Sequence, residues 1–222
     1  MIRLSVTDLD SMLYWRDSED MDFDALLARL RGEEPPGPNM LAGRAFHKLL
    51  ENAAEGAEWF AQEQDGLRFD FAIDDEIALP QIRELKAEYL LQTPSGPVTL
   101  VGKIDGLQGI TIHDYKLTER FDAERYVDSY QWRSYLLMFG VERFVYDVFV
   151  CRYDTARVYV FDYQRLPVCA YPGMEADVHR EVCALAEIVA KHVPQKITPD
   201  EPMPENLGPR KGPIRIEKRT RA

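Results

Sequence analysis

Apolar residues recur at intervals of three and four along several stretches of the chain, which is the spacing of one face of an α-helix. The pattern predicts helices over residues 9–15, 23–30, 40–56, 122–140 and 174–192. Asn39 and Asp122 suit the N-cap positions of two of these helices, and Gly140 suits the residue just beyond the end of one. Residues 76–85 are also apolar, and we assign them to a further helix.

Other stretches alternate polar with apolar residues, or are rich in Val, Phe and Tyr, as β-strands are. They predict an extended entry over residues 4–6, a strand over residues 67–73, and three hairpins that join residues 87–92 to 98–107, 102–107 to 110–116, and 144–153 to 157–163. Because strands and helices are interspersed, we predict an α/β fold with a central mixed sheet flanked by helices.

The hairpin over residues 102–116 carries charges where a buried sheet face would carry Val or Ile. Side chains alternate between the two faces of a strand, so Asp114 and Lys116 point the same way. Asp105, on the preceding strand, falls on that face as well. Two carboxylates and a lysine therefore converge on one face of the sheet.

The register of this hairpin depends on its turn. We place the turn at residues 108–109, which pairs Leu107 with Ile110 and makes Asp105 a diagonal neighbour of Asp114. Two interpretations of the charges are open at this point. The lysine can form a cross-strand salt bridge on a solvated sheet face, or the carboxylates can hold a hard cation.

Length and charge distribution suggest one domain and a tail. The chain has 222 residues, enough for one large core, and we assign residues 1–195 to a single domain and residues 196–222 to a Pro-rich, basic tail. The net charge is −11, and residues 1–80, with 18 acidic and 7 basic side chains, account for all of it. The tail either holds a phosphate backbone or is a flexible, solubilising end.

The sequence indicates a cytoplasmic protein without membrane contact. No apolar run approaches the length of a membrane span, and the N-terminus lacks the basic flank and apolar core of a signal peptide. Cys151, Cys169 and Cys183 are an odd number without CxxC spacing. We therefore expect buried free thiols and neither a disulfide framework nor a zinc site.

Four short motifs follow one another along the chain. They are Gly43-x3-His47 on a predicted helix, Gly102-Lys103-Ile104-Asp105 and Asp114-Tyr115-Lys116 on two predicted strands, and Gln131-x3-Tyr135 on the next helix. Their order, over roughly residues 4–163, resembles the PD-(D/E)XK nuclease superfamily, and within it the RecB-like exonucleases of phage recombination and CRISPR-associated systems. The resemblance implies a restriction-endonuclease-like core and a bacterial or phage-encoded protein acting in the cytoplasm.

The resemblance also implies a metal site. By their places in the motifs, His47, Asp105 and Asp114 would bind a divalent metal together with the backbone carbonyl of Tyr115. Oxygen ligands suit Mg²⁺, and a histidine ligand also suits Mn²⁺. Glu88, on the strand before, either supports a second metal or is a solvated edge residue.

The remaining motif residues would act on water and DNA. The resemblance implies that Lys116 positions or helps to activate the attacking water and stabilises phosphate charge, and that Gln131 and Tyr135 orient the DNA strand or the lysine. His113 lies on the opposite strand face from Asp114, so we expect it to be packed and not catalytic.

Two features depart from the family pattern. Ile104 stands where a proline commonly precedes the first acid, which leaves the chemistry unchanged. Iron–sulfur members need four cysteines, one of them near the start, whereas the first cysteine here is Cys151. We therefore expect no iron–sulfur cluster.

These observations predict a Mg²⁺- or Mn²⁺-dependent deoxyribonuclease, namely an exonuclease that hydrolyses phosphodiester bonds at DNA ends in recombination, repair or phage DNA processing. Two alternatives stay open: a structure-specific endonuclease of the same fold, and a non-catalytic module that binds nucleic acid or protein. The resemblance to phage exonucleases further allows a homo-oligomeric ring around DNA or a recombination partner protein.

Overall fold

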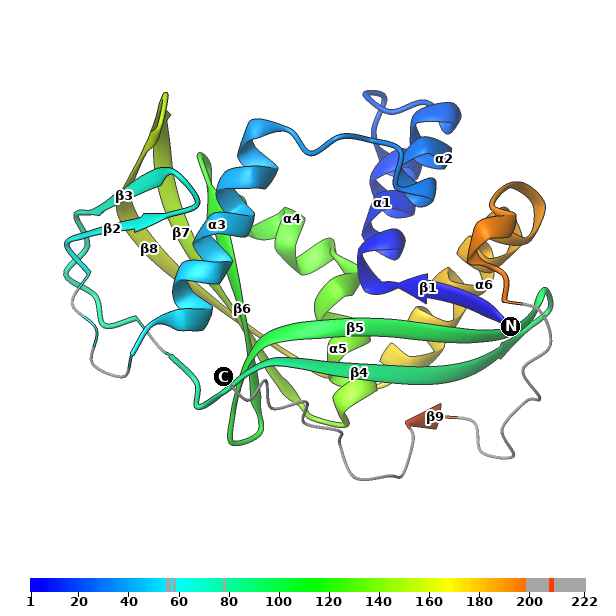
Figure 1. Cartoon of the computed structure of the whole chain (residues 1–222). Helices are drawn as coiled ribbons and strands as arrows, with labels where there is room; N and C mark the ends of the chain where they lie inside the picture. The colour runs from blue at the N-terminus through cyan, green and yellow to red at the C-terminus, as the bar shows by residue number, and fades with distance from the viewer. Residues whose placement is uncertain (55–56, 58, 78, 199–207, 210–222) are drawn as a thin grey trace, which may run out of the picture.

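The computed structural model describes residues 1–54, 57, 59–77, 79–198 and 208–209 (Figure 1). The strands in these residues are β1 (Ile2–Ser5), β2 (Ala61–Gln64), β3 (Leu67–Phe71), β4 (Ile82–Thr93), β5 (Gly96–Gln108), β6 (Thr111–Thr118), β7 (Arg143–Asp154), β8 (Arg157–Cys169) and β9 (Gly208–Pro209). The helices are α1 (Val6–Asp17), α2 (Phe23–Arg31), α3 (Pro38–Asn52), α4 (Ala123–Asp128), α5 (Tyr130–Phe139) and α6 (Met174–His192), followed by a 3-10 turn, η1 (Pro194–Lys196). None of the helices in this described part is long and apolar enough to cross a membrane.

The described strands form one mixed sheet in the order β2-β3-β8-β7-β6-β5-β4-β9, with β1 paired to β5 beside this path. The pairs β1/β5, β3/β8 and β6/β7 are parallel, and the other pairs are antiparallel. Helices flank the sheet (Figure 1). The predicted α/β class with a central mixed sheet is therefore confirmed.

Two apolar clusters hold the helices against the sheet. Along β7, Tyr146 and Val148 belong to the cluster under α1, α2, α5 and α6, whereas Phe149 belongs to the cluster under α3. Since neighbouring side chains of a strand point to opposite faces, the two helix layers cover opposite faces of the sheet. Phe46 of α3 is fully buried and packs edge-on against Phe149, with ring centroids 4.9 Å apart.

The helix expected over residues 76–85 is wrong. Strand β4 begins at Ile82, and residues 76, 77 and 79–81 are in neither helix nor strand. Pro80 lies inside the expected helix, where its ring would clash with the preceding turn and remove a hydrogen bond. A short apolar segment fits a strand and a helix equally well by periodicity, and here the strand pairing with β5 decides.

The turn between β5 and β6 lies one residue later than expected. Gln108 pairs with Thr111, so the turn consists of Gly109, with φ +59°, and Ile110. Ile110 is β-branched, which suggested a strand residue, yet it is 60% exposed in the turn. The pairing shifts by two residues relative to the expected one, which leaves every side chain on its predicted face.

The helix expected over residues 122–140 is interrupted. Asp122 caps its start and Gly140 ends it in the left-handed conformation, as predicted, but Ser129 breaks it into α4 and α5 with ψ 141°. The Ser129 hydroxyl accepts a hydrogen bond from the Gln131 amide and caps α5. The break gives α5 an N-terminus of its own inside the molecule.

Two smaller expectations also need correction. Helix α3 starts at Pro38 with Gly37 as its N-cap, so Asn39 is not the cap; proline suits the first helical position because it has no amide to satisfy. Cys151 is buried and Cys183 is partly buried, but Cys169, the last residue of β8, is exposed.

Most of the predicted tail, including the basic residues from position 210 onward, lies outside the described residues.

Candidate functional site

One edge of β5 is shared between two partners. Strand β1 pairs with Val98–Val101 and β6 pairs with Gly106–Gln108, so in the described sheet Gly102–Asp105 have no ladder partner on that side. The Tyr135 hydroxyl of α5 donates to the Lys103 carbonyl across 2.9 Å in this interval. Asp105 therefore lies at the point where β5 and β6 diverge, directly before the residues of β5 that pair with β6.

Gly102 allows the close approach of α5 to β5. A Cβ atom at this position would lie 2.5 Å from Cε1 of Tyr135 and 3.1 Å from Cγ2 of Val6. Any larger residue would push the tyrosine ring away from the strand. The glycine of the Gly102–Asp105 motif is thus explained by packing.

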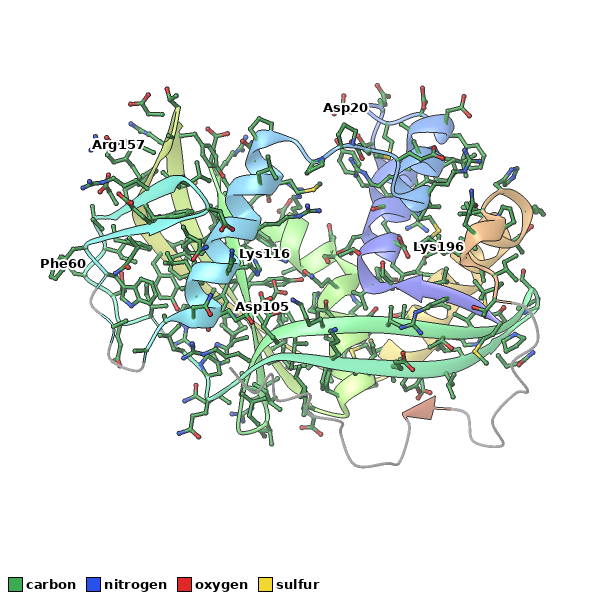
Figure 2. The ribbon with its side chains drawn as sticks, viewed as in Figure 1. Asp20, Phe60, Asp105, Lys116, Arg157 and Lys196 are labelled. Atoms are coloured by element: carbon green, nitrogen blue, oxygen red, sulfur yellow. The ribbon has the colours of Figure 1, made fainter. Side chains whose placement is uncertain are left out.

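Asp105 connects β5, β6 and α3. Its Oδ2 atom accepts a hydrogen bond from the Tyr115 amide at 2.8 Å, and its Oδ1 atom lies 3.1 Å from Nδ1 of His47. Helix α3 presents His47 to this carboxylate, because the neighbouring Phe46 and Leu50 fix the apolar face of the helix against the sheet. Figure 2 shows Asp105 and Lys116 close to each other beside α3.

Asp114 and Lys116 form the second half of the cluster. The Lys116 Nζ atom lies 2.7 Å from Asp114 Oδ2 and 5.8 Å from the ring centroid of Tyr146. The contact between Lys116 and Asp114 is an ion pair. Apart from this ion pair, Asp114 Oδ2 and the Tyr146 hydroxyl are among the buried side-chain atoms without a hydrogen-bond partner in the described residues.

These groups act strongly on one another's protonation. Burial raises the pKa of Asp114 to about 6, although Lys116 opposes this shift. Burial alone would raise the pKa of Asp105, but the charges of His47 and Lys116 and the Tyr115 amide hold it below its ordinary value. Burial alone would lower the pKa values of His47 and Lys116, and the carboxylates beside them hold both above their ordinary values.

Asp10 is a member of this neighbourhood that sequence reasoning missed. It lies on α1, accepts a hydrogen bond from the Ser129 hydroxyl at 3.0 Å, and also bonds the backbone at the start of α5. Its charge acts on Lys116, and burial raises the pKa of Asp10. No spacing in the sequence relates Asp10 to Lys116, because only the packing of α1 beside the start of α5 brings the two charges near each other.

Glu84 is a second such residue. It lies on β4 between two residues that pair with Gly106 and Ile104, which places it at the ladder position facing Asp105. Its φ of +57° is unusual for a side chain other than glycine, and its carboxylate is ion-paired with Lys103. A strained backbone at this position is typical of functional sites.

The other predicted residues are placed as follows. Gln131 and Tyr135 are both buried on α5, and the Tyr135 hydroxyl is engaged by the Lys103 carbonyl. Glu88 does not join Asp105: it pairs with Val101 in the ladder and forms an ion pair with Arg3 at 2.9 Å. Val101, the partner of Glu88, lies four positions before Asp105 along β5, which accounts for this separation.

The donor set suits a hard divalent cation, since it combines two carboxylates and an imidazole. A cation would also satisfy Asp114 Oδ2, the buried oxygen that lacks a hydrogen-bond donor. Among the described residues, however, no three His, Cys, Asp or Glu side chains are arranged to hold a metal ion. The groups are bound to one another instead, Lys116 to Asp114 and His47 to Asp105.

Comparison with known proteins finds a similar fold among solved structures. No protein-family model matches the chain. No curated protein matches it either. The structure of SSO0001 is 13% identical, with a TM-score of 0.50 over 89% of this chain and 89% of that one. At this identity the match shows a shared fold and no more.

Two further solved structures are similar at lower TM-scores. A proposed exonuclease from Eubacterium rectale is 12% identical, with a TM-score of 0.49 over 89% of this chain and 84% of that one. LHK-Exo, crystallised with dAMP, is 12% identical, with a TM-score of 0.41 over 87% of this chain and 92% of that one. These two matches add nothing to the conclusion about the fold.

Proposed function

We propose that the chain is a divalent-metal-dependent deoxyribonuclease of the PD-(D/E)XK type, acting as an exonuclease on DNA ends. One observation carries the proposal: two buried carboxylates, Asp105 and Asp114, meet a lysine and a histidine at the divergence of β5 and β6. Burying two carboxylates together is unfavourable unless cations accompany them, and it is a recurrent arrangement at metal-dependent phosphodiesterase sites.

The metal would be held by Asp105, Asp114, His47 and the backbone carbonyl of Tyr115. A bound divalent cation lowers the pKa of its water ligand and neutralises charge on the phosphate. A bound cation would replace the contacts of the carboxylates with Lys116 and His47. The Tyr115 amide would keep the Asp105 carboxylate oriented, because it bonds Oδ2, whereas His47 contacts Oδ1.

Lys116 supplies positive charge to the scissile phosphate and orients the attacking water. In the structure its ammonium group lies between Asp114 and the face of the Tyr146 ring, within the same cluster of charges. Gln131 and Tyr135 border the same region from α5 and orient the DNA strand or the lysine. The Tyr135 hydroxyl donates to the Lys103 carbonyl and so acts through the backbone of β5.

The proposal is tested by cleavage of end-labelled linear duplex DNA and of closed circular DNA in Mg²⁺, in Mn²⁺ and in EDTA. We expect cleavage of the linear substrate only, and none in EDTA. Asp114→Ala and Lys116→Ala should each lower the rate by about 100-fold or more, in the range of a lost catalytic group. Lys191→Ala, an exposed lysine on α6, is the matched control and should keep its rate.

The outcomes separate the alternatives. Cleavage of circular DNA would favour the structure-specific endonuclease. Full activity of either site variant, with a native melting curve, would contradict the proposed site. A protein that binds DNA but neither cleaves it nor binds metal in calorimetry would be the non-catalytic module.

A further inference from the structure

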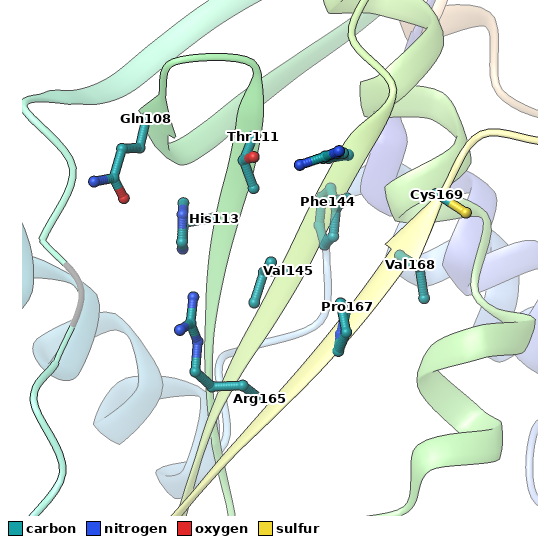
Figure 3. Close-up of a pocket in the computed structure, with 10 residues that line it drawn as sticks. Gln108, Thr111, His113, Phe144, Val145, Arg165, Pro167, Val168 and Cys169 are labelled. Carbon is teal, nitrogen blue, oxygen red and sulfur yellow. The ribbon is translucent and has the colours of Figure 1, made fainter.

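A pocket lies near the turn between β5 and β6, and none of the candidate nuclease residues lines it. It has a volume of about 520 Å³ and is lined from β5, β6, β7 and β8 (Figure 3). His113 and Val145 in its wall alternate along their strands with Asp114 and Tyr146. The pocket is therefore on the sheet face opposite to Asp114, the face that α3 covers further along.

A buried carboxylate organises the wall of this pocket. Asp147 is fully buried, and its Oδ2 atom lies 2.7 Å from Nδ1 of His113. Its Oδ1 atom accepts hydrogen bonds from the Tyr163 hydroxyl at 2.5 Å and from Nε of Arg165 at 3.2 Å. Three partners thus satisfy the carboxylate, and the carboxylate fixes the orientation of the imidazole and the guanidinium group.

The remaining polar atoms of these side chains face the pocket. About half of the Arg165 side chain is exposed, and its terminal nitrogens bond no described residue; Figure 3 shows it reaching from β8 toward His113. The Nε2 atom of His113 likewise has no partner among the described residues. Arg143 adds a second exposed guanidinium group that forms no ion pair within the described part of the chain.

The side chains of the pocket wall predict two kinds of group in the ligand, one that accepts hydrogen bonds from the guanidinium groups and one that bonds the imidazole. Two guanidinium groups favour a phosphate, which accepts several hydrogen bonds from them. Because Nδ1 of His113 contacts Asp147, Nε2 is the ring nitrogen left for the ligand, and it suits a hydroxyl or amine, which can both donate and accept a hydrogen bond. Val145 and Pro167 supply an apolar floor between these groups.

We propose that this pocket binds a phosphate monoester of the size of a mononucleotide, with the phosphate on Arg143 and Arg165 and a hydroxyl or amine on His113. The volume is within the usual range of small-molecule sites, about 300–1,000 Å³. In a chain with a net charge of −11, two arginines without a full set of acidic partners also mark a place that selects anions. The inference does not depend on the proposed nuclease activity.

Calorimetric titration with thymidine 5′-monophosphate, in EDTA so that metal does not contribute, tests the inference. We expect saturable binding, and thymidine should bind at least about tenfold more weakly because it lacks the charged hydrogen bonds. Arg143→Gln should weaken nucleotide binding by about tenfold or more for the same reason. Arg152→Gln is the matched control, since Arg152 is exposed on the same strand outside the pocket, and it should bind like the unmodified chain.

Four results would overturn the inference. They are no saturable binding, equal binding by Arg143→Gln, equal affinity for thymidine, and an equal affinity for inorganic phosphate, which would mean that the nucleoside is not recognised. Lys116→Ala should leave the binding unchanged. If it abolishes binding, the nucleotide occupies the candidate nuclease site and the pocket does not bind it; loss of nuclease activity with intact nucleotide binding leaves this inference standing.

Discussion

At the scale of single residues, the candidate site depends on which charges are buried together. Strand alternation was enough to place Asp105, Asp114 and Lys116 on one face, because a side chain's face follows from its position alone. It could not reveal Asp10 or Glu84. Asp10 reaches Lys116 only because α1 packs beside the start of α5, and Glu84 faces Asp105 only because β4 pairs with β5 in one particular register.

Replacing Gly102 with alanine should lower the free energy of unfolding by about 1–3 kcal/mol, the usual cost of overpacking. The added Cβ would meet the Tyr135 ring at 2.5 Å and displace it from the Lys103 carbonyl. Gly43→Ala is the control, because nothing lies within 4 Å of its added Cβ and alanine favours the helix by about 1 kcal/mol. Urea denaturation should show a lower free energy of unfolding for Gly102→Ala and a higher one for Gly43→Ala. Equal changes in the two variants would contradict this explanation of Gly102.

Cys151 should make the protein less stable in alkali. Burial raises the pKa of its thiol from 9.0 to about 11, with Tyr153 opposing the shift and Glu119 adding to it. The contribution is fully present below pH 9 and is lost as the pH rises to about 11, since only the unfolded chain ionises in that interval. Unfolding midpoints measured from pH 8 to 11 should fall less steeply for Cys151→Ala; parallel curves would contradict the prediction.

At the scale of elements, the sequence predicted most strands and helices because their periodicity is long and regular. It failed where a local signal was outweighed by packing. Ile110 looks like a strand residue but occupies a turn, and the helix pattern continues through Ser129 although the chain breaks there. The break at Ser129 lies beside the candidate site, where the Ser129 hydroxyl bonds Asp10, whereas Ile110 lies in the turn between β5 and β6, beside the pocket lined by Gln108 and Thr111.

Helix α3 should depend on Arg83. The Nη1 atom of this residue donates to the carbonyls of Leu50, Glu51 and Ala53, the groups that a helix end leaves without partners. Arg83→Met should therefore cost about 1.5–3 kcal/mol of stability, the range for hydrogen bonds to a charged group.

The same substitution should lower DNA cleavage, because α3 carries His47. Arg152→Met, a surface change on β7, is the control for both stability and cleavage. Unfolding curves and cleavage rates measured on the same preparations test whether Arg83 holds α3 in place for cleavage. A stable Arg83→Met protein with normal cleavage would show that the contact does not position α3.

At the scale of the whole molecule, alternation of strands and helices was sufficient to predict the α/β class, but not the order of strands. The sheet places β3 beside β8, although almost 90 residues separate them, and no local pattern encodes such a pairing. The acidic first third of the chain argues against broad adhesion to DNA. Binding should therefore rest on few phosphate contacts.

A chain that ends at Pro209 tests the basic tail while keeping β9 paired to β4. If the tail contacts phosphates, the affinity of the full chain for duplex DNA should fall more steeply with salt, since each neutralised phosphate adds about −0.9 to the slope. Cleavage at saturating DNA should be the same for both chains. Identical salt slopes would assign the tail a solubilising role.

The central claim is that Asp105 belongs to a metal-dependent nuclease site and that Glu88, which forms an ion pair with Arg3, does not. The most direct test is the cleavage rate of linear DNA at saturating Mg²⁺ for Asp105→Asn and Glu88→Gln, each with a melting curve to verify folding. We predict a loss of about 100-fold or more for Asp105→Asn, and a change equivalent to no more than about 0.5 kcal/mol for Glu88→Gln, as for an ordinary surface substitution. A folded Asp105→Asn protein that cleaves DNA at the unmodified rate would contradict the claim.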